Sequence, residues 1–222
     1  MQQLSTALLF PILIGLSLSS CTTLKEIFYD RPNPLAPLSS DRLGSTPRDE
    51  IIKRFGNPDE INKRVVDSFD SEVYFYYDRD ESKGPPVEAK FLACEFNKGV
   101  LNAYSFYDSS EPTQKWVDEA ERFKLVKGKS TKQEAEQLLG TPTSKALLPT
   151  TITLAALAMQ QGGATFPLNK IPEDSKEAWQ YFSPNYDDYL HKSAQKTLTL
   201  FFDAQGIYLG SSMMQELVIK SQ

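Results

Sequence analysis

GSTPRDEIIKRFGNP, residues 44–58, outlines one structural unit, and 84 positions later the chain repeats its plan as GKSTKQEAEQLLGTP, residues 128–142. Each stretch begins with a glycine, has a hydroxyl side chain two positions further on, and ends in Gly-x-Pro. One such stretch would indicate only a turn. Two at a fixed offset predict that the chain contains two copies of one unit.

Each stretch predicts a short amphipathic helix with defined ends. Thr46, followed by Pro47, and Ser130 are the expected N-caps, because a hydroxyl oxygen at this position accepts a hydrogen bond from an otherwise unpaired helix amide. Gly56 and Gly140 are expected to end the helices in a left-handed conformation. The proline two positions after each glycine prevents the helix from continuing.

β-Prone stretches follow each helix in the same order. In the first copy they are residues 72–78, 89–96 and 100–107, with Asn97–Gly99 as a hairpin turn. In the second copy they are residues 179–182, 196–202 and 207–212, with Asp203–Gly206 as the turn. A further helix is expected over residues 109–123, between the copies.

This order of elements, with its Gly-x-Pro helix ends, aromatic strands and glycine hairpins, resembles the BamE family, also called SmpA/OmlA. In the second copy the resemblance is carried by Val126, Gly128, Ser130, Leu139, Gly140, Pro142, Trp179, Tyr181, Leu198, Leu200, Phe202 and Gly206. In the first copy it is carried by Leu43, Gly44, Thr46, Phe55, Gly56, Pro58, Tyr74, Tyr76, Leu92, Phe96 and Gly99. The tandem arrangement is also similar to that of β-lactamase inhibitor proteins.

The resemblance implies an α+β fold of two tandem BamE-like lobes, each with two helices packed on one face of a three-stranded antiparallel sheet. The lobes are expected over residues 43–108 and 109–215. The second lobe carries an insertion, residues 143–176, because its aromatic strand begins much further from the proline than in the first copy.

The N-terminus predicts a lipid anchor. Residues 1–20 contain no charged side chain, and their apolar core, residues 7–18, has the length of a signal peptide rather than of a membrane span. The following Leu-Ser-Ser-Cys, residues 18–21, resembles the lipobox of bacterial lipoproteins, which implies cleavage before Cys21 and acylation of its sulfur. We expect residues 21–42, rich in proline and serine, to form a flexible tether. Thr22, rather than Asp, implies the periplasmic face of the outer membrane.

The insertion is the largest difference between the copies. A helix is expected from Thr150, Thr151 or Thr153 to Gln161, with Leu154, Leu157 and Met159 among its apolar residues. This helix either covers a sheet face or the seam between lobes, or it docks a partner or the membrane surface. Leu154, Leu157 and Met159, together with Tyr74 and Tyr76, are therefore the candidate partner-binding residues.

Composition and motifs argue against several other classes. The formal net charge is −5, and no run of basic residues exceeds two, so nucleic acid is not an expected partner. His191 is the only histidine, and neither a nucleophile elbow, a phosphate-binding loop nor a metal-ligand spacing is present. We expect no catalytic residue, no metal and no cofactor.

The expected protein is thus a non-enzymatic outer-membrane lipoprotein that binds another envelope protein. The BamE resemblance implies a role in outer-membrane assembly or integrity, beside the machinery that inserts β-barrel proteins. One alternative is an inhibitor-like module that grips an envelope enzyme with outward tyrosines such as Tyr74, Tyr76, Tyr104 or Tyr208. A second alternative is an unrecognised hydrolase that depends on His191.

Overall fold

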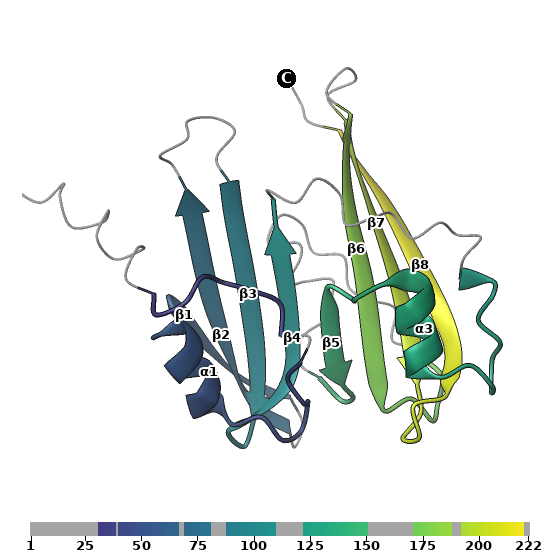
Figure 1. Ribbon diagram of the computed structural model, residues 1–222, viewed down its shortest axis with the longest axis horizontal. Helices are drawn as coiled ribbons and strands as arrows, with labels where there is room; N and C mark the ends of the chain where they lie inside the picture. The colour runs from purple at the N-terminus through teal and green to yellow at the C-terminus, as the bar shows by residue number, and fades with distance from the viewer. Residues whose placement is uncertain are drawn as a thin grey trace, which may run out of the picture. The chain divides into compact units, whose positions relative to one another are not determined.

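Eight antiparallel strands form a single sheet in the described part of the protein, and their order in the sheet is their order in the chain (Figure 1). The computed structural model describes residues 31–38, 40–66, 69–80, 88–109, 122–150, 171–187 and 192–219 of the 222. None of the helices in these ranges combines the length and the apolar composition needed to cross a membrane.

The strands are β1 (Glu60–Val66), β2 (Phe69–Asp80), β3 (Glu88–Asn97), β4 (Val100–Asp108), β5 (Ser144–Leu147), β6 (Glu177–Asp187), β7 (Lys192–Phe202) and β8 (Tyr208–Ile219). The helices are α1 (Arg48–Phe55) and α3 (Lys132–Leu139). The six predicted strands and both repeat helices are confirmed, and β1 and β5 were not predicted.

The expected fold of two lobes, each with two helices on a three-stranded sheet, is wrong. Over the described residues there is one eight-stranded sheet with two helices. Strand β5 makes it continuous, because Ala146 pairs with Ala103 of the first copy and with Ala178 of the second. The helix expected over residues 109–123 lies mostly outside the described residues; Arg122 is helical, but Phe123 lies in a turn.

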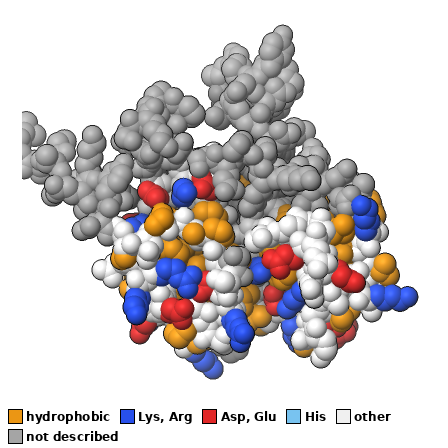
Figure 2. Space-filling view, viewed as in Figure 1, with side chains coloured by type: hydrophobic (Ala, Val, Ile, Leu, Met, Phe, Trp, Pro, Cys, Tyr) orange, Lys and Arg blue, Asp and Glu red, His pale blue; other side chains and the backbone are white. Residues whose placement is uncertain are grey.

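Both helices pack on the same face of the sheet. Residues that pair directly in neighbouring antiparallel strands point to the same side. Tyr104, in the core beneath α1, pairs with Lys145, and Lys145 pairs with Trp179, in the core beneath α3. We call this side the helix face and the opposite side the back face. Figure 2 shows the helix face, where acidic and basic side chains lie interspersed rather than in a patch of one sign.

Each helix is held to the hairpin of its own copy by the same hydrogen bonds. The Gly44 amide donates to the Leu101 carbonyl at 2.7 Å, and the Arg48 amide donates to the Gly99 carbonyl at 2.9 Å. In the second copy the equivalent bonds join Gly128 to Tyr208 at 2.8 Å and Lys132 to Gly206 at 3.0 Å. The duplication predicted from the sequence therefore extends to individual backbone contacts.

The two hydroxyl residues do not cap the helices, which corrects the prediction for Thr46 and Ser130. Thr46 Oγ1 accepts from the Arg42 amide, and Ser130 Oγ accepts from the Val126 amide, each at 3.0 Å. Each hydroxyl thus closes the turn before its helix. The cap residues lie one position later: Pro47 offers no side-chain bond, and Thr131 forms a capping box with Glu134.

The glycines that end the helices have the predicted positive φ. Gly56 and Gly140 both have φ of 82°, but their ψ values, −167° and −170°, are extended rather than helical. This region of backbone space is open essentially to glycine alone. The Gly-x-Pro signal therefore reports an abrupt turn out of the helix, not a left-handed helical residue.

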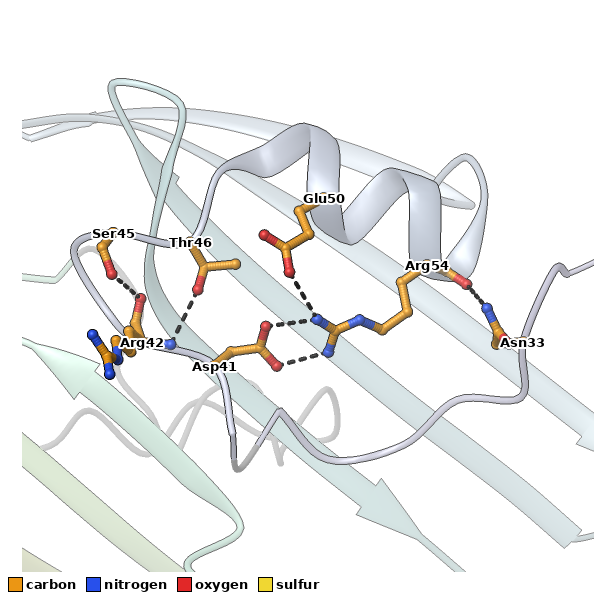
Figure 3. Close-up of polar contacts among 7 residues, drawn as sticks. All are labelled: Asn33, Asp41, Arg42, Ser45, Thr46, Glu50 and Arg54. Carbon is orange, nitrogen blue, oxygen red and sulfur yellow. Dashed lines mark hydrogen bonds and ion pairs between the residues drawn. The ribbon is translucent and has the colours of Figure 1, made fainter.

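The chain before α1 packs on the domain, although the sequence assigned it to a tether that reaches residue 42. Leu35 and Leu38 are 2% and 0% exposed in the core beneath α1. Asp41 binds Arg54 through both carboxylate oxygens, at 2.7 and 2.8 Å, and Asn33 Nδ2 donates to the Arg54 carbonyl at 2.7 Å (Figure 3). Residues from at least Leu35 onward thus belong to the folded domain.

The second copy has apolar residues in place of this ion pair. Leu125 and Leu138 occupy the positions equivalent to Asp41 and Arg54, and both belong to the core around α3. The Asp41 side chain is only 3% exposed, so the first copy removes a carboxylate from water to make the contact. Buried ion pairs can often be exchanged for apolar pairs, but not one partner at a time.

Asp41→Leu and Arg54→Leu, made singly, are each expected to lower the free energy of unfolding by about 2–4 kcal/mol. The buried Asp41 carboxylate loses its partner in one variant, and Arg54 keeps only its exposed contact with Glu50 in the other. The double variant copies the second repeat and is expected to lie within about 1 kcal/mol of the natural protein. Urea unfolding measures all of these values.

The control for that series is Glu50→Gln, which removes the other carboxylate near Arg54. The Glu50 side chain is 55% exposed, so its loss is expected to cost less than about 0.5 kcal/mol. Additive losses in the double variant would show that the two copies are not interchangeable at this contact.

Candidate binding surface

The two copies agree on the helix face and differ on the back face. On the helix face, equivalent positions are apolar or aromatic in both copies: Tyr74 and Trp179, Tyr76 and Tyr181, Leu92 and Leu198, Cys94 and Leu200, Phe96 and Phe202. On the back face they differ in kind: Phe75 and Gln180, Phe91 and Thr197, Ala93 and Thr199, Glu95 and Phe201. Packing of the helices accounts for the first set. It does not account for the second.

Four aromatic side chains form a strip along one end of the back face. Tyr77 lies 5.3 Å from Phe91 between ring centroids, and Tyr107 lies 6.3 Å from Phe182 in an edge-to-face arrangement. We call these four residues the aromatic strip. All four are partly exposed, and the strip runs from β2 of the first copy to β6 of the second. Burial, followed by the charge of Asp108, raises the pKa of Tyr107, so its hydroxyl stays neutral at physiological pH.

A band of small polar groups adjoins the strip on the central strands. Ser144 Oγ donates to Ser105 Oγ at 2.8 Å, and Gln180 Nε2 donates to Thr199 Oγ1 at 3.0 Å. All four side chains are buried, and they satisfy one another in pairs. The polar band therefore supports the sheet and does not offer a free binding group.

A buried acid holds the first residues of the insertion against the back face. Glu95 is 0% exposed, and its Oε2 accepts from Asn102 Nδ2 at 2.8 Å and from Thr150 Oγ1 at 2.6 Å. The Leu148 amide donates to the Lys176 carbonyl at 2.9 Å, which closes the base of the insertion. Leu148 and Ile171 also pack against the back-face core. Both described ends of the insertion are thus fixed to this face.

The tyrosines proposed as partner contacts are buried on the helix face. Tyr74, Tyr76, Tyr104 and Tyr208 are between 0% and 6% exposed. Tyr76 lies beneath α1, with its ring centroid 6.0 Å from that of Phe55. These side chains therefore stabilise the helices and do not face a partner. Cys21, Leu154, Leu157, Met159 and His191 lie outside the described residues.

The sequence does not show that Tyr77, rather than its neighbours, is accessible. Residues 72–78 read EVYFYYD, with aromatic side chains on both faces of the strand. Alternation separates Tyr76 from Tyr77, but it does not say which face the helix covers. The difference between the copies at Phe75 and Phe91 was the available signal.

The described residues contain no cluster of three or more His, Cys, Asp or Glu side chains that could hold a metal ion. Cys94 is fully buried, and burial, with a smaller effect from the charge of Asp41, raises its pKa well above the usual range. A neutral, inaccessible thiol is a poor nucleophile. The absence of an active site in the whole chain stays a prediction.

Comparison with known proteins does not assign the chain to a family. No protein-family model matches the chain, and no curated protein matches it. Among solved structures, the chain is similar to one described as a putative β-lactamase inhibitor protein from Streptococcus mutans, with a TM-score of 0.43 and 12% identity. That match covers 86% of this chain and 94% of the other. None of these comparisons returns a BamE-family protein.

Glu95→Ala tests the anchor at the base of the insertion. The variant leaves the Asn102 amide and the Thr150 hydroxyl without this acceptor, and the free energy of unfolding is expected to fall by about 2–3 kcal/mol. Amide exchange at Leu148 is expected to accelerate more than exchange at Ala135, which lies in α3 on the helix face. Glu134→Ala is the control, because it removes an exposed acid within α3 together with its capping-box contact to Thr131, and is expected to accelerate exchange in α3 and to leave Leu148 unchanged. Equal acceleration at both amides would contradict a local anchor.

Proposed function

We propose that this protein is a non-enzymatic binding module, tethered to the periplasmic face of the outer membrane through an acylated Cys21. Its partner is another envelope protein, and the aromatic strip on the back face is the binding surface. The observation that carries the proposal is a difference between the copies on the back face: Phe91 of the strip lies where the second copy has Thr197, and the neighbouring Phe75 lies where it has Gln180. Partly exposed aromatics are the commonest anchors of protein interfaces.

Two roles agree with such a surface. A partner in the assembly or integrity of the outer membrane would make the protein a scaffold beside the barrel-inserting machinery. A soluble envelope enzyme as partner would make it an inhibitor-like module. The identity of the bound protein separates these roles.

A photo-crosslinking amino acid in place of Tyr107, in the full acylated chain, is expected to give an adduct with one envelope protein. A barrel-assembly component would support scaffolding, and a soluble enzyme would support inhibition. Ile61 is the matched control position, because it is 48% exposed and lies on the helix face, paired with Tyr74. The same adduct from Ile61, or none from Tyr107, would count against the strip.

Once the partner is known, Phe91→Ala is expected to weaken binding about tenfold to a hundredfold, as truncation of an interface aromatic typically does. Isothermal titration measures the change, and thermal unfolding confirms that the variant is folded. Ile61→Ala is expected to bind as the natural protein does.

Anchoring has its own test. Cys21→Ser is expected to abolish labelling by radioactive palmitate and to release the protein from the membrane fraction, because only the cysteine sulfur accepts the diacylglyceryl group. A variant that still labels and sediments with membranes would refute the lipid anchor, whatever the outcome for the aromatic strip.

A further inference from the structure

The turn before α3 carries a concentration of exposed charge and apolar surface. Its sequence, RFKLVKGK over residues 122–129, contains four basic residues and no acid. Of the three large hydrophobic side chains that are exposed in the described ranges, two lie here: Phe123 is 71% exposed and Val126 is 50% exposed. We call residues 122–129 the basic turn. It contrasts with the net charge of the whole chain, which is −5.

The first copy shows that the fold does not require these side chains. Its equivalent turn makes the same contact with its hairpin, through Gly44, and the same closure, through Thr46. Where the basic turn has Lys124, Lys127 and Lys129, the first copy has Ser40, Leu43 and Ser45. The lysines and the exposed apolar groups are therefore additions to a turn that forms without them.

The exposed ring is held in place. The Arg122 guanidinium carbon lies 4.7 Å from the centroid of the Phe123 ring, within the range of a cation–π contact. Arg122 Nε is buried and has no hydrogen-bond partner in the described part of the chain. A stacked arginine limits the positions the ring can adopt, so the loss of side-chain freedom on binding is smaller.

The backbone of the basic turn is fixed as well. The Ser130 amide donates to the Val126 carbonyl at 2.9 Å, and the Lys129 amide donates to the same carbonyl at 3.1 Å. The Gly128 amide joins the turn to Tyr208, and the Val126 amide joins it to the Ser130 hydroxyl. Phe123 and Val126 thus project from a hydrogen-bonded support.

We infer that the basic turn is a second protein-binding site, which fits a partner surface where an apolar pocket is rimmed by acidic side chains. Phe123 is the group that fills the pocket, and Lys127 and Lys129 face the acidic rim. Many protein interfaces have an aromatic side chain surrounded by charged groups. The charges raise the association rate and the specificity for the partner.

A protein fits these observations better than a lipid surface does. Peripheral membrane binding draws on the long apolar face of an amphipathic helix, together with basic residues. The basic turn offers two apolar side chains on a tight turn, and its aromatic ring is stacked rather than free to enter a bilayer. The inference does not rest on the aromatic strip, which lies on the back face, whereas the basic turn precedes a helix of the helix face.

The test places p-benzoylphenylalanine at position 123 of the full acylated chain in its native host. We expect one protein adduct, with the crosslinked peptide next to Asp or Glu side chains. The double variant Lys127→Gln and Lys129→Gln is expected to reduce the adduct about tenfold or more. Addition of about 0.5 M salt to membrane extracts is expected to reduce it as well, because exposed charges are screened.

The matched control removes two exposed lysines elsewhere, as Lys53→Gln and Lys98→Gln, and is expected to leave the adduct unchanged. Lys127→Glu should abolish the adduct, and reversal of the nearest acid on the partner should restore it. The inference is overturned if no protein adduct forms, if both double variants behave alike, or if the adduct is to lipid. Binding to lipid is tested by sedimentation of the chain without residues 1–21 with vesicles of phosphatidylglycerol or of phosphatidylcholine. Charge-dependent sedimentation with phosphatidylglycerol alone would assign the turn to a membrane and refute a protein site.

Discussion

The turn that precedes each helix is the contact on which the rest of the structure depends. A glycine amide in that turn donates to the strand after the hairpin, a hydroxyl closes the turn, and the first helix amide donates to the hairpin glycine. Positive φ at Gly44 (76°) and Gly128 (75°) lets the amide point at the strand, which a side chain would oppose. Each short helix, too short to be stable alone, is thereby fixed to one face of the sheet.

This contact fixes both helices to the same face of the sheet. Packing against the helices therefore restricts the residue types on the helix face, but not those on the back face. The helix face keeps apolar residues in both copies. The back face carries the aromatic strip, which spans both copies, a buried acid that holds the base of the insertion, and polar pairs on the central strands. The divergence between the copies within one chain is the observation that supports the proposed binding surface.

The sequence predicted what is local and missed what depends on distant pairing. Helices, six strands, both hairpins and the positive φ of Gly56 and Gly140 follow from residue type and short spacing. Strand β5 has only four residues, SKAL, and it is a strand because it pairs with Ala103 on one side and Ala178 on the other. Neither pairing can be predicted from local sequence, so the sequence did not predict a single sheet. Thr46 and Ser130 were misassigned because an N-cap and a turn use the same hydroxyl chemistry. The aromatic strip was missed because aromatic residues alternate on both faces of β2.

Whether the two copies share one sheet is tested most directly by a disulfide between β4 and β5. Ser105 and Ser144 pair across these strands with their hydroxyl oxygens 2.8 Å apart, so cysteines at both positions meet the distance a disulfide needs. With Cys21→Ser in place and Cys94 buried, Ser105→Cys/Ser144→Cys is expected to oxidise completely in the folded state and to keep the native circular dichroism. Ser105→Cys/Ser212→Cys, which joins β4 to β8, is expected to stay reduced. Failure of the first pair to form in folded protein would contradict the continuous sheet.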